Sequence, residues 1–214
     1  MIRGLLLDVG GVVIRTPFEM LDVAERRLGL AAGALGSRGP FDPDGDTEFA
    51  RVSAGDLTER AYWQRRAERA APVLGVDADF RSFMHALYDV PPEDVVRAET
   101  AALVDDVRAA GIRLGMLTND LYDFHGEAWV ARMGIFARAE VLVDVSRHGV
   151  LKPDPDAYRL GIEAMGMPAA ELLFLDDQPV NTAGARDVGL VVIDVDVLRP
   201  QEAIDAARKA LQLR

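Results

Sequence analysis

Five short apolar runs constrain the fold of this 214-residue chain more than any other feature. Four of them lack polar alternation, which is typical of strands in a parallel sheet that is covered on both faces. Segments with helical spacing separate the later runs, and several of these segments stop at a glycine, where helices commonly end. Strand and helix therefore alternate from about residue 94 onward, and the sequence predicts an α/β fold with a doubly wound, Rossmann-like parallel sheet. The five runs are 2–7, 112–117, 140–143, 172–175 and 190–193.

Residues 16–93 interrupt this alternation, because they contain helical patterns without a convincing strand. They also contain a passage rich in glycine, proline and aspartate, GSRGPFDPDGD, at 36–46. We therefore expect a small helical domain at 16–93, inserted after the first strand. The Rossmann-like core would then comprise two pieces of the chain, 1–15 and 94–214.

Acidic and hydroxylic residues follow the predicted strands. In an open parallel sheet, ligands bind in the crevice outside the carboxyl ends of the strands, so these residues are candidates for a functional site. Each of these residues could instead have a purely structural role, since aspartate and threonine often cap helices or form turns and a single lysine is usually a solvated charge. Their convergence on one side of one sheet makes a shared site the better interpretation. The residues are Asp8 after the first run, Thr118, Asn119 and Asp120 after the second, Asp176 and Asp177 after the fourth, and Lys152 in the KPDPDAY segment before it.

Taken in order, these motifs resemble those of the haloacid dehalogenase-like (HAD) hydrolase superfamily. The motifs are DVGGVV beginning at Asp8, Thr118-Asn119, Lys152-Pro153, and Asp176-Asp177 with Asn181. The likeness covers 1–15 and 94–195, and the predicted helical domain falls where many members carry a cap domain. In detail the motifs are most similar to small phosphatases that act on sugar phosphates and to the phosphatase domain of epoxide hydrolases.

The resemblance implies a Mg²⁺-dependent phosphatase in which the Asp8 carboxylate attacks phosphorus and forms an aspartyl phosphate. It also implies a Mg²⁺ ion held by Asp8, the Gly10 carbonyl and Asp176, with Asp177 close by or acting through water. The substrate would be a small phosphorylated metabolite such as a sugar phosphate.

The same resemblance assigns other motif residues to the phosphoryl group. Thr118 and the backbone amide of Asn119 would donate hydrogen bonds to its oxygens, and Lys152 would offset the charge that develops on them. Asn181 would support the metal ligands without binding the ion, unless it simply caps or packs the helix that begins near Pro179.

Gly10 departs from the pattern of the superfamily. Most of its phosphatases carry a second aspartate two residues after the nucleophile, which protonates the leaving oxygen and later activates water. Loss of such a group typically costs about 10²- to 10⁴-fold in rate. The sequence therefore permits a leaving group that needs little protonation, such as an anomeric sugar phosphate or an acyl phosphate. It also permits a substitute acid, for which Asp120 is the first choice unless it caps the helix near Leu121, or phosphate binding with very slow turnover.

Two other functions remain open. A low-turnover phosphometabolite-binding or regulatory protein would keep the same fold and motifs. A 2-haloacid dehalogenase would use the same aspartate on a carbon–halogen bond without metal. The dehalogenases, however, have a bulky aromatic residue where Gly10 stands, and they do not carry paired acids like Asp176-Asp177.

The composition limits which residues could bind a metal and which classes of partner are expected. The chain has no cysteine and only three histidines, so a metal site would have to be built mainly from oxygen. Its 24 Lys+Arg against 35 Asp+Glu give a net charge of −11, so neither nucleic acid nor an anionic membrane surface is an expected partner. The apolar start is too short for a signal peptide and no run reaches the roughly 18 residues of a membrane span, so a cytoplasmic protein is expected. The sequence leaves the oligomeric state open.

Overall fold

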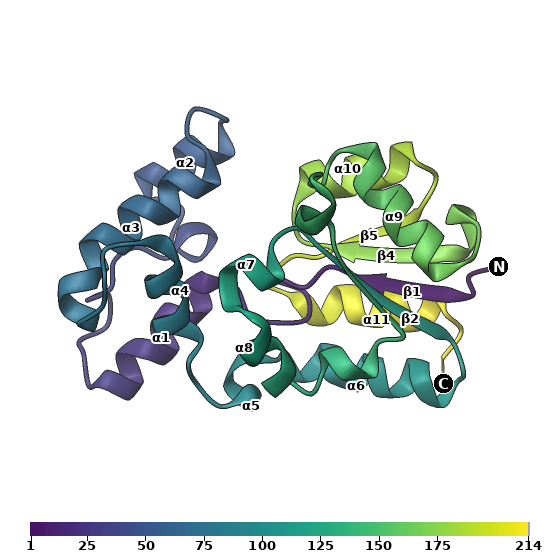
Figure 1. Cartoon of the computed structure of the whole chain (residues 1–214), viewed down its shortest axis with the longest axis horizontal. Helices are drawn as coiled ribbons and strands as arrows, with labels where there is room; N and C mark the ends of the chain where they lie inside the picture. The colour runs from purple at the N-terminus through teal and green to yellow at the C-terminus, as the bar shows by residue number, and fades with distance from the viewer. Residues whose placement is uncertain (214) are drawn as a thin grey trace. The chain divides into compact units, whose positions relative to one another are not determined.

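The computed structural model describes residues 1–213 and divides them into two compact units. The core unit combines Met1–Ile14 with the chain from Val96 onward, and the helical unit comprises Arg15–Val95. The strands of the described chain all lie in the core unit (Figure 1). None of the helices in residues 1–213 is both long enough and apolar enough to cross a membrane.

The core unit is built on a sheet in the order β3-β2-β1-β4-β5, with every neighbouring pair parallel. This arrangement confirms the predicted Rossmann-like α/β fold. β1 and β4 form where apolar residues are fully buried on both faces of the sheet. In the register, Leu6 of β1 lies opposite Gly115 of β2 and Phe174 of β4. The strands are β1 (Gly4–Leu7), β2 (Arg113–Thr118), β3 (Val141–Asp144), β4 (Leu172–Asp176) and β5 (Val191–Asp194).

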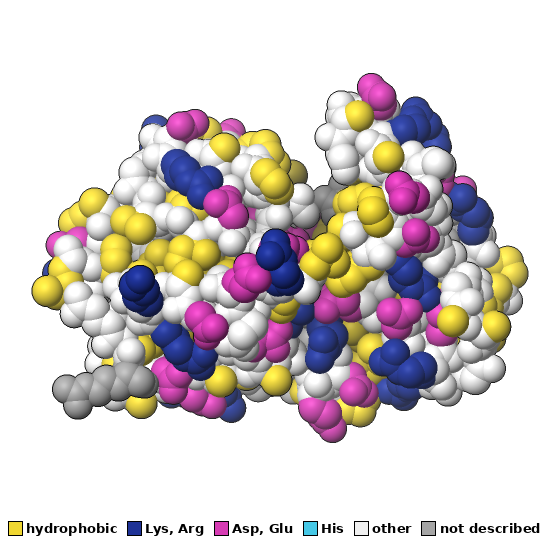
Figure 2. All heavy atoms as spheres, turned by 180° about the vertical axis from the view of Figure 1, so that it is seen from behind, with side chains coloured by type: hydrophobic (Ala, Val, Ile, Leu, Met, Phe, Trp, Pro, Cys, Tyr) yellow, Lys and Arg dark blue, Asp and Glu magenta, His cyan; other side chains and the backbone are white. Residues whose placement is uncertain are grey.

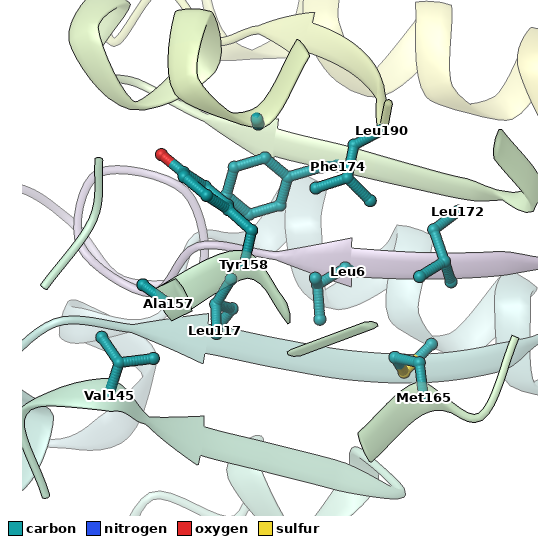
Figure 3. Close-up of a cluster of buried hydrophobic side chains, with 10 residues drawn as sticks. Leu6, Leu117, Val145, Ala157, Tyr158, Met165, Leu172, Phe174 and Leu190 are labelled. Atoms are coloured by element: carbon teal, nitrogen blue, oxygen red, sulfur yellow. The ribbon is translucent and has the colours of Figure 1, made fainter. Parts of the chain in front are cut away.

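Helices cover both faces of this sheet. The face covered by α9 and α10 buries Leu6, Phe174, Tyr158 and Met165 in one apolar cluster (Figure 3). Gly115 permits the close approach of α9, because a Cβ atom there would lie 2.5 Å from the Met165 sulfur. α6 and α11 lie on the opposite face (Figure 1). The helices are α6 (Ala98–Ala109), α7 (Leu121–His125), α8 (Glu127–Arg132), α9 (Pro155–Met165), α10 (Pro179–Asp187) and α11 (Pro200–Ala210), with 3-10 turns at Phe136–Arg138, Val145–His148 and Ala169–Glu171.

The helical unit packs around aromatic side chains. The rings of Phe18 and Trp63 lie 4.7 Å apart, and the Tyr62 hydroxyl donates to Asp46 at 2.6 Å. Thr16 caps α1 through a capping box with Glu19, which satisfies backbone N–H groups at the start of the helix. The helices are α1 (Pro17–Leu28), α2 (Thr47–Ser53), α3 (Glu59–Leu74), α4 (Phe80–Tyr88) and α5 (Pro92–Val95), with a 3-10 turn at Gly39–Phe41.

Charged side chains of both signs are mixed on the surface. On the face shown in Figure 2, acidic and basic groups lie among one another without one large patch of a single sign. Many form exposed ion pairs, such as Arg199 with Asp196 and Arg138 with Asp105. Pairs of this kind contribute little to stability because water screens them. The excess of acid therefore does not by itself mark a binding surface.

Candidate active site

A buried lysine joins two carboxylates at the carboxyl edge of the sheet. Lys152 Nζ lies 2.7 Å from Asp8 Oδ1 and 2.6 Å from Asp176 Oδ2. Asp8 follows β1, where its backbone N–H donates to the Leu175 carbonyl at 2.8 Å, and Asp176 is the last residue of β4. The sheet therefore fixes both carboxylates, and it brings Asp8 to a lysine that is 144 positions away in the chain.

The Asn119 side chain holds the backbone of Lys152 in place. Its Oδ1 accepts from the Lys152 N–H at 2.7 Å, and its Nδ2 donates to the Lys152 carbonyl at 3.2 Å. These reciprocal bonds tie the end of β2 to the segment that precedes α9. The Lys152 side chain therefore starts from a fixed backbone, and its ammonium group lies between Asp8 and Asp176.

Asp176 is completely buried, and nitrogen donors surround its oxygens. Lys152 Nζ and the Gln178 N–H (2.8 Å) each donate to one oxygen, and the Asn181 side-chain amide lies 3.2 Å from both. The backbone carbonyl of Asn181 accepts from the Tyr158 hydroxyl at 2.7 Å, which fixes the start of α10. These contacts fix the orientation of the Asp176 carboxylate.

Asp177 lies against the turn that follows Asp8. A Cβ atom on Gly11 would lie only 2.4 Å from Asp177 Oδ2, and Gly11 has a φ of +72°, which glycine adopts without strain. One carboxylate oxygen each from Asp8, Asp176 and Asp177 lie within 4.8 Å of one another. Mg²⁺ prefers oxygen ligands of this kind. The donor set therefore fits a hard divalent cation.

Gly10 has room for a side chain. A Cβ atom there would meet no atom within 4 Å, and the residue is exposed. Unlike Gly11, Gly10 does not have a positive φ. Neither packing nor backbone conformation therefore requires a glycine at this position.

Burial and neighbouring charge set the protonation of the central pair. Burial raises the pKa of Asp8 to about 7, and Asp176 adds to this rise while Lys152 opposes it. Burial alone would lower the pKa of Lys152, but Asp8 and Asp176 raise it well above its usual range. Lys152 is therefore a fixed cation, whereas additional positive charge near Asp8 would favour its ionised form.

The remaining predicted residues lie along the same edge of the sheet. Thr118 is the buried last residue of β2, next to Asn119. Asp120 precedes α7, and its side chain makes no capping bond to that helix. The structure thus brings Asp8, Asn119, Lys152, Asp176 and Asn181 into one bonded network.

The sequence reasoning missed a buried carboxylate at the end of the third strand. Asp144 accepts from the Tyr122 N–H at 2.9 Å and from the Ser146 hydroxyl at 2.7 Å, so it joins the segments after β2 and β3. It terminates an apolar run just as Asp8 does, and the same rule could have found it. Arg97, which donates to the Gly11 carbonyl at 2.8 Å, had no such signal.

A family model for haloacid dehalogenase-like hydrolases matches residues 2–189 of the chain. Acyl-CoA dehydrogenase family member 10 of Mus musculus is 24% identical over 203 residues, which cover 94% of this chain but only 18% of that protein. The (S)-2-haloacid dehalogenase of Xanthobacter autotrophicus is 27% identical over 195 residues, which are 77% of this chain and 76% of that protein. Phosphoglycolate phosphatase of Rhodospirillum rubrum is 26% identical over 197 residues, or 89% of this chain and 78% of that protein.

Among solved structures, a HAD phosphatase from Thermococcus onnurineus superposes with a TM-score of 0.63. The alignment covers 98% of both chains at 16% sequence identity. At this level of identity the likeness concerns the fold.

Proposed function

The chain belongs to the haloacid dehalogenase-like hydrolase family, and we propose that it is a Mg²⁺-dependent phosphatase that acts through Asp8 on a small phosphorylated metabolite. The observation that carries this proposal is the bond of buried Lys152 to both Asp8 and Asp176, with Asp177 close to both carboxylates. One fixed ammonium among three acids leaves a negative site that suits a divalent cation. The similarity to a phosphoglycolate phosphatase supports the same reaction class.

Asp8, Asp177 and the Gly10 carbonyl are the groups that we propose to hold the cation. Asp176, also a ligand in the prediction from sequence, places Lys152 and has an oxygen close to those of Asp8 and Asp177, so we propose it as a further ligand. A bound Mg²⁺ would reduce the repulsion between an Asp8 carboxylate and an incoming phosphate group.

Two displacements at phosphorus make up the proposed reaction. First, an Asp8 oxygen bonds to phosphorus while the bond to the leaving oxygen breaks, and that oxygen departs with the electron pair. Lys152, Thr118 and the Asn119 backbone amide would stabilise the phosphoryl oxygens. Water then attacks phosphorus, the bond to Asp8 breaks, Asp8 regains its charge, and the proton from water leaves with inorganic phosphate.

Gly10 leads us to propose a substrate whose leaving group departs without protonation. Acyl phosphates are of this kind, and anomeric sugar phosphates are the second class that we propose. Lys152 is a poor proton donor, because its two carboxylate partners raise its pKa. Asp120 is the side chain that we propose as a substitute acid if substrates with poor leaving groups are hydrolysed.

Phosphate release from a panel of phosphate esters and acyl phosphates, with Mg²⁺ or with EDTA, tests the reaction class. Asp8→Asn should abolish release because an amide is a poor nucleophile, and Asp177→Asn should raise the Mg²⁺ concentration needed for activity. Asp205→Asn, at an exposed carboxylate on α11, is the matched control. Phosphate release by Asp8→Asn at the rate of the unmodified protein would refute the mechanism.

A second candidate is hydrolysis of a 2-haloacid, which the Xanthobacter relative favours. In that reaction an Asp8 oxygen would attack carbon and displace halide, without a cation. The acidic group of Asp8, Asp176 and Asp177 argues against it, because these carboxylates suit a metal ion. Chloride release from 2-chloropropionate in EDTA, lost in Asp8→Asn, would establish this candidate instead.

A third candidate is a phosphometabolite-binding protein with very slow turnover. Gly10 favours it, since the turn after Asp8 carries no acid there. Tight binding of a phosphate ester in calorimetry, without release of phosphate over hours, would support this function over the enzyme.

We also propose that the helical unit serves as the cap domain that selects the substrate. Exchange of Arg15–Val95 for the corresponding segment of a relative should then change substrate preference while the Mg²⁺ requirement stays. An unchanged preference would contradict this role.

A further inference from the structure

The turn after Asp8 is closed by its own backbone. The Val9 carbonyl accepts from the N–H groups of Val13 and Ile14, each at 2.9 Å. Gly10 forms an isolated bridge with Ile14, and Gly11 has the positive φ that reverses the chain. The turn therefore presents a short series of carbonyl groups next to the Asp8 carboxylate.

Two side chains near the start of α6 engage the next carbonyls of the turn. Arg97 Nε donates to the Gly11 carbonyl at 2.8 Å, and Thr100 Oγ1 donates to the Val12 carbonyl at 2.7 Å. Arg97 also donates its backbone N–H to the Val13 carbonyl at 3.0 Å. Arg97 is 2% exposed and Thr100 1%, so both bonds lie in the interior.

The carbonyl groups of the turn differ in whether they accept a hydrogen bond. Within residues 1–213, the carbonyls of Val9, Gly11, Val12 and Val13 accept hydrogen bonds, whereas that of Gly10 accepts none of the bonds described. The carbonyl without a donor belongs to the one exposed residue of 9–13. It lies two residues after Asp8 in the chain.

We propose that Arg97 and Thr100 are positioning residues that hold this turn so that the Gly10 carbonyl is available to a divalent cation. The inference rests on the proposed function, because it needs a cation beside Asp8. Gly11 connects the two sides of the site, since Arg97 holds its carbonyl while Asp177 packs against its α-carbon. A shift of Gly11 would therefore disturb Gly10 and Asp177 together.

The physical basis is the cost of an unpaired buried carbonyl. Without the Thr100 hydroxyl, the Val12 carbonyl loses its donor in the interior, which is unfavourable unless the turn rearranges. Rearrangement moves the groups that would bind the cation. Residues that orient metal ligands in this way typically change affinity by about 10- to 100-fold when mutated.

Binding of Mn²⁺ to the full chain, followed by electron paramagnetic resonance without substrate and by competition with Mg²⁺, tests the proposal. Thr100→Val keeps the size of the side chain and removes the hydroxyl, and it should weaken Mn²⁺ binding by about tenfold or more. Thr100→Ser keeps the hydroxyl and should bind within about twofold of the unmodified protein. Arg97→Met should weaken binding at least as much as Thr100→Val.

Thermal unfolding in EDTA separates positioning from general destabilisation. Thr58→Val removes the capping bond to the Ala61 N–H in the helical unit and is the matched control. It should lower the unfolding temperature without weakening Mn²⁺ binding. If Thr100→Val lowers stability but binds Mn²⁺ normally, the positioning role is wrong while the proposed function stands. If the unmodified protein and Asp177→Asn both fail to bind Mn²⁺ and Mg²⁺, the metal-dependent function itself is wrong.

Discussion

Replacement of Gly10 by aspartate should give this protein a proton donor for the leaving group. The position is exposed, a Cβ atom there would meet nothing within 4 Å, and its φ is not positive. The new side chain can therefore enter without displacing a neighbour. Because glycine loses more freedom on folding than other residues, stability should change by about 1 kcal/mol or less.

The gain in rate should depend on the leaving group. A positioned general acid contributes about 10²- to 10⁴-fold, which lowers the barrier by about 3–5 kcal/mol. That gain applies to alkyl and phenyl phosphates, whose leaving oxygen must be protonated. It should be small for acyl or dinitrophenyl phosphates, whose leaving oxygen already holds negative charge well.

The assay is kcat/KM for a series of phosphates that runs from dinitrophenyl through phenyl to alkyl esters. This ratio reports the first displacement, whereas kcat also contains hydrolysis of the aspartyl phosphate that all substrates share. The unmodified protein should show a steep dependence on leaving-group pKa, and Gly10→Asp should flatten it. Gly10→Asn, of nearly equal volume without an acid, should remain steep.

Two results would refute this reasoning. A flat dependence in the unmodified protein would mean that another group already donates the proton, and a steep dependence in Asp120→Asn would then identify Asp120 as that group. A folded, Mg²⁺-binding Gly10→Asp protein with an unchanged slope would mean that proton transfer at position 10 does not limit the reaction.

Three further predictions follow from the same site. Lys152→Met should lower the free energy of unfolding by about 3–5 kcal/mol in chemical denaturation, because it leaves buried Asp8 and Asp176 without their cation. Gly11→Ala should weaken Mn²⁺ binding by about tenfold or more, since its Cβ would collide with Asp177, whereas Gly10→Ala should bind as the unmodified protein does. Mg²⁺ affinity, measured by calorimetry, should fall by up to about tenfold per pH unit as the pH drops below about 7, because a proton competes with the ion for Asp8. Above that pH the affinity should level off. A Mg²⁺ affinity that is constant between roughly pH 5 and 8 would contradict this competition.

The strands were predictable because each lies in a short, mainly apolar run. The run at 172–175 became β4 (Leu172–Asp176) with one extra residue, and the run at 2–7 became β1 (Gly4–Leu7). In the region 16–93, the sequence predicts helical patterns at 18–28, 56–70 and 79–88, which overlap α1, α3 and α4, but none of them corresponds to α2 (Thr47–Ser53). Its short length gives too few turns for a periodic signal.

The candidate residues could be found from sequence, but their bonds could not. Asp176 and Asp177 are adjacent and look equivalent in the motif, yet successive residues of an extended chain point to opposite sides. One therefore faces the Lys152 ammonium in the interior, and the other lies against Gly11. Arg97 lies far from every motif and follows no strand, so its bond to the Gly11 carbonyl depends on tertiary packing alone.

The local charge of the site, not the −11 of the whole chain, decides how an anionic substrate can bind. Surface charges are mixed in sign, and their influence is largely screened beyond about 8 Å at physiological ionic strength. The ionised forms of Asp8, Asp176 and Asp177 with Lys152 leave two uncompensated negative charges in a mostly buried place. Burial raises the pKa of Asp8 to about 7, and neighbouring Asp176 adds to this rise, so a proton can remove one of the two charges. A monovalent ion would do no more than that proton, whereas a divalent cation balances both charges and leaves Asp8 ionised for attack. The surplus of two negative charges beyond what Lys152 balances is thus a physical reason for the site to need a divalent metal before it accepts a phosphate.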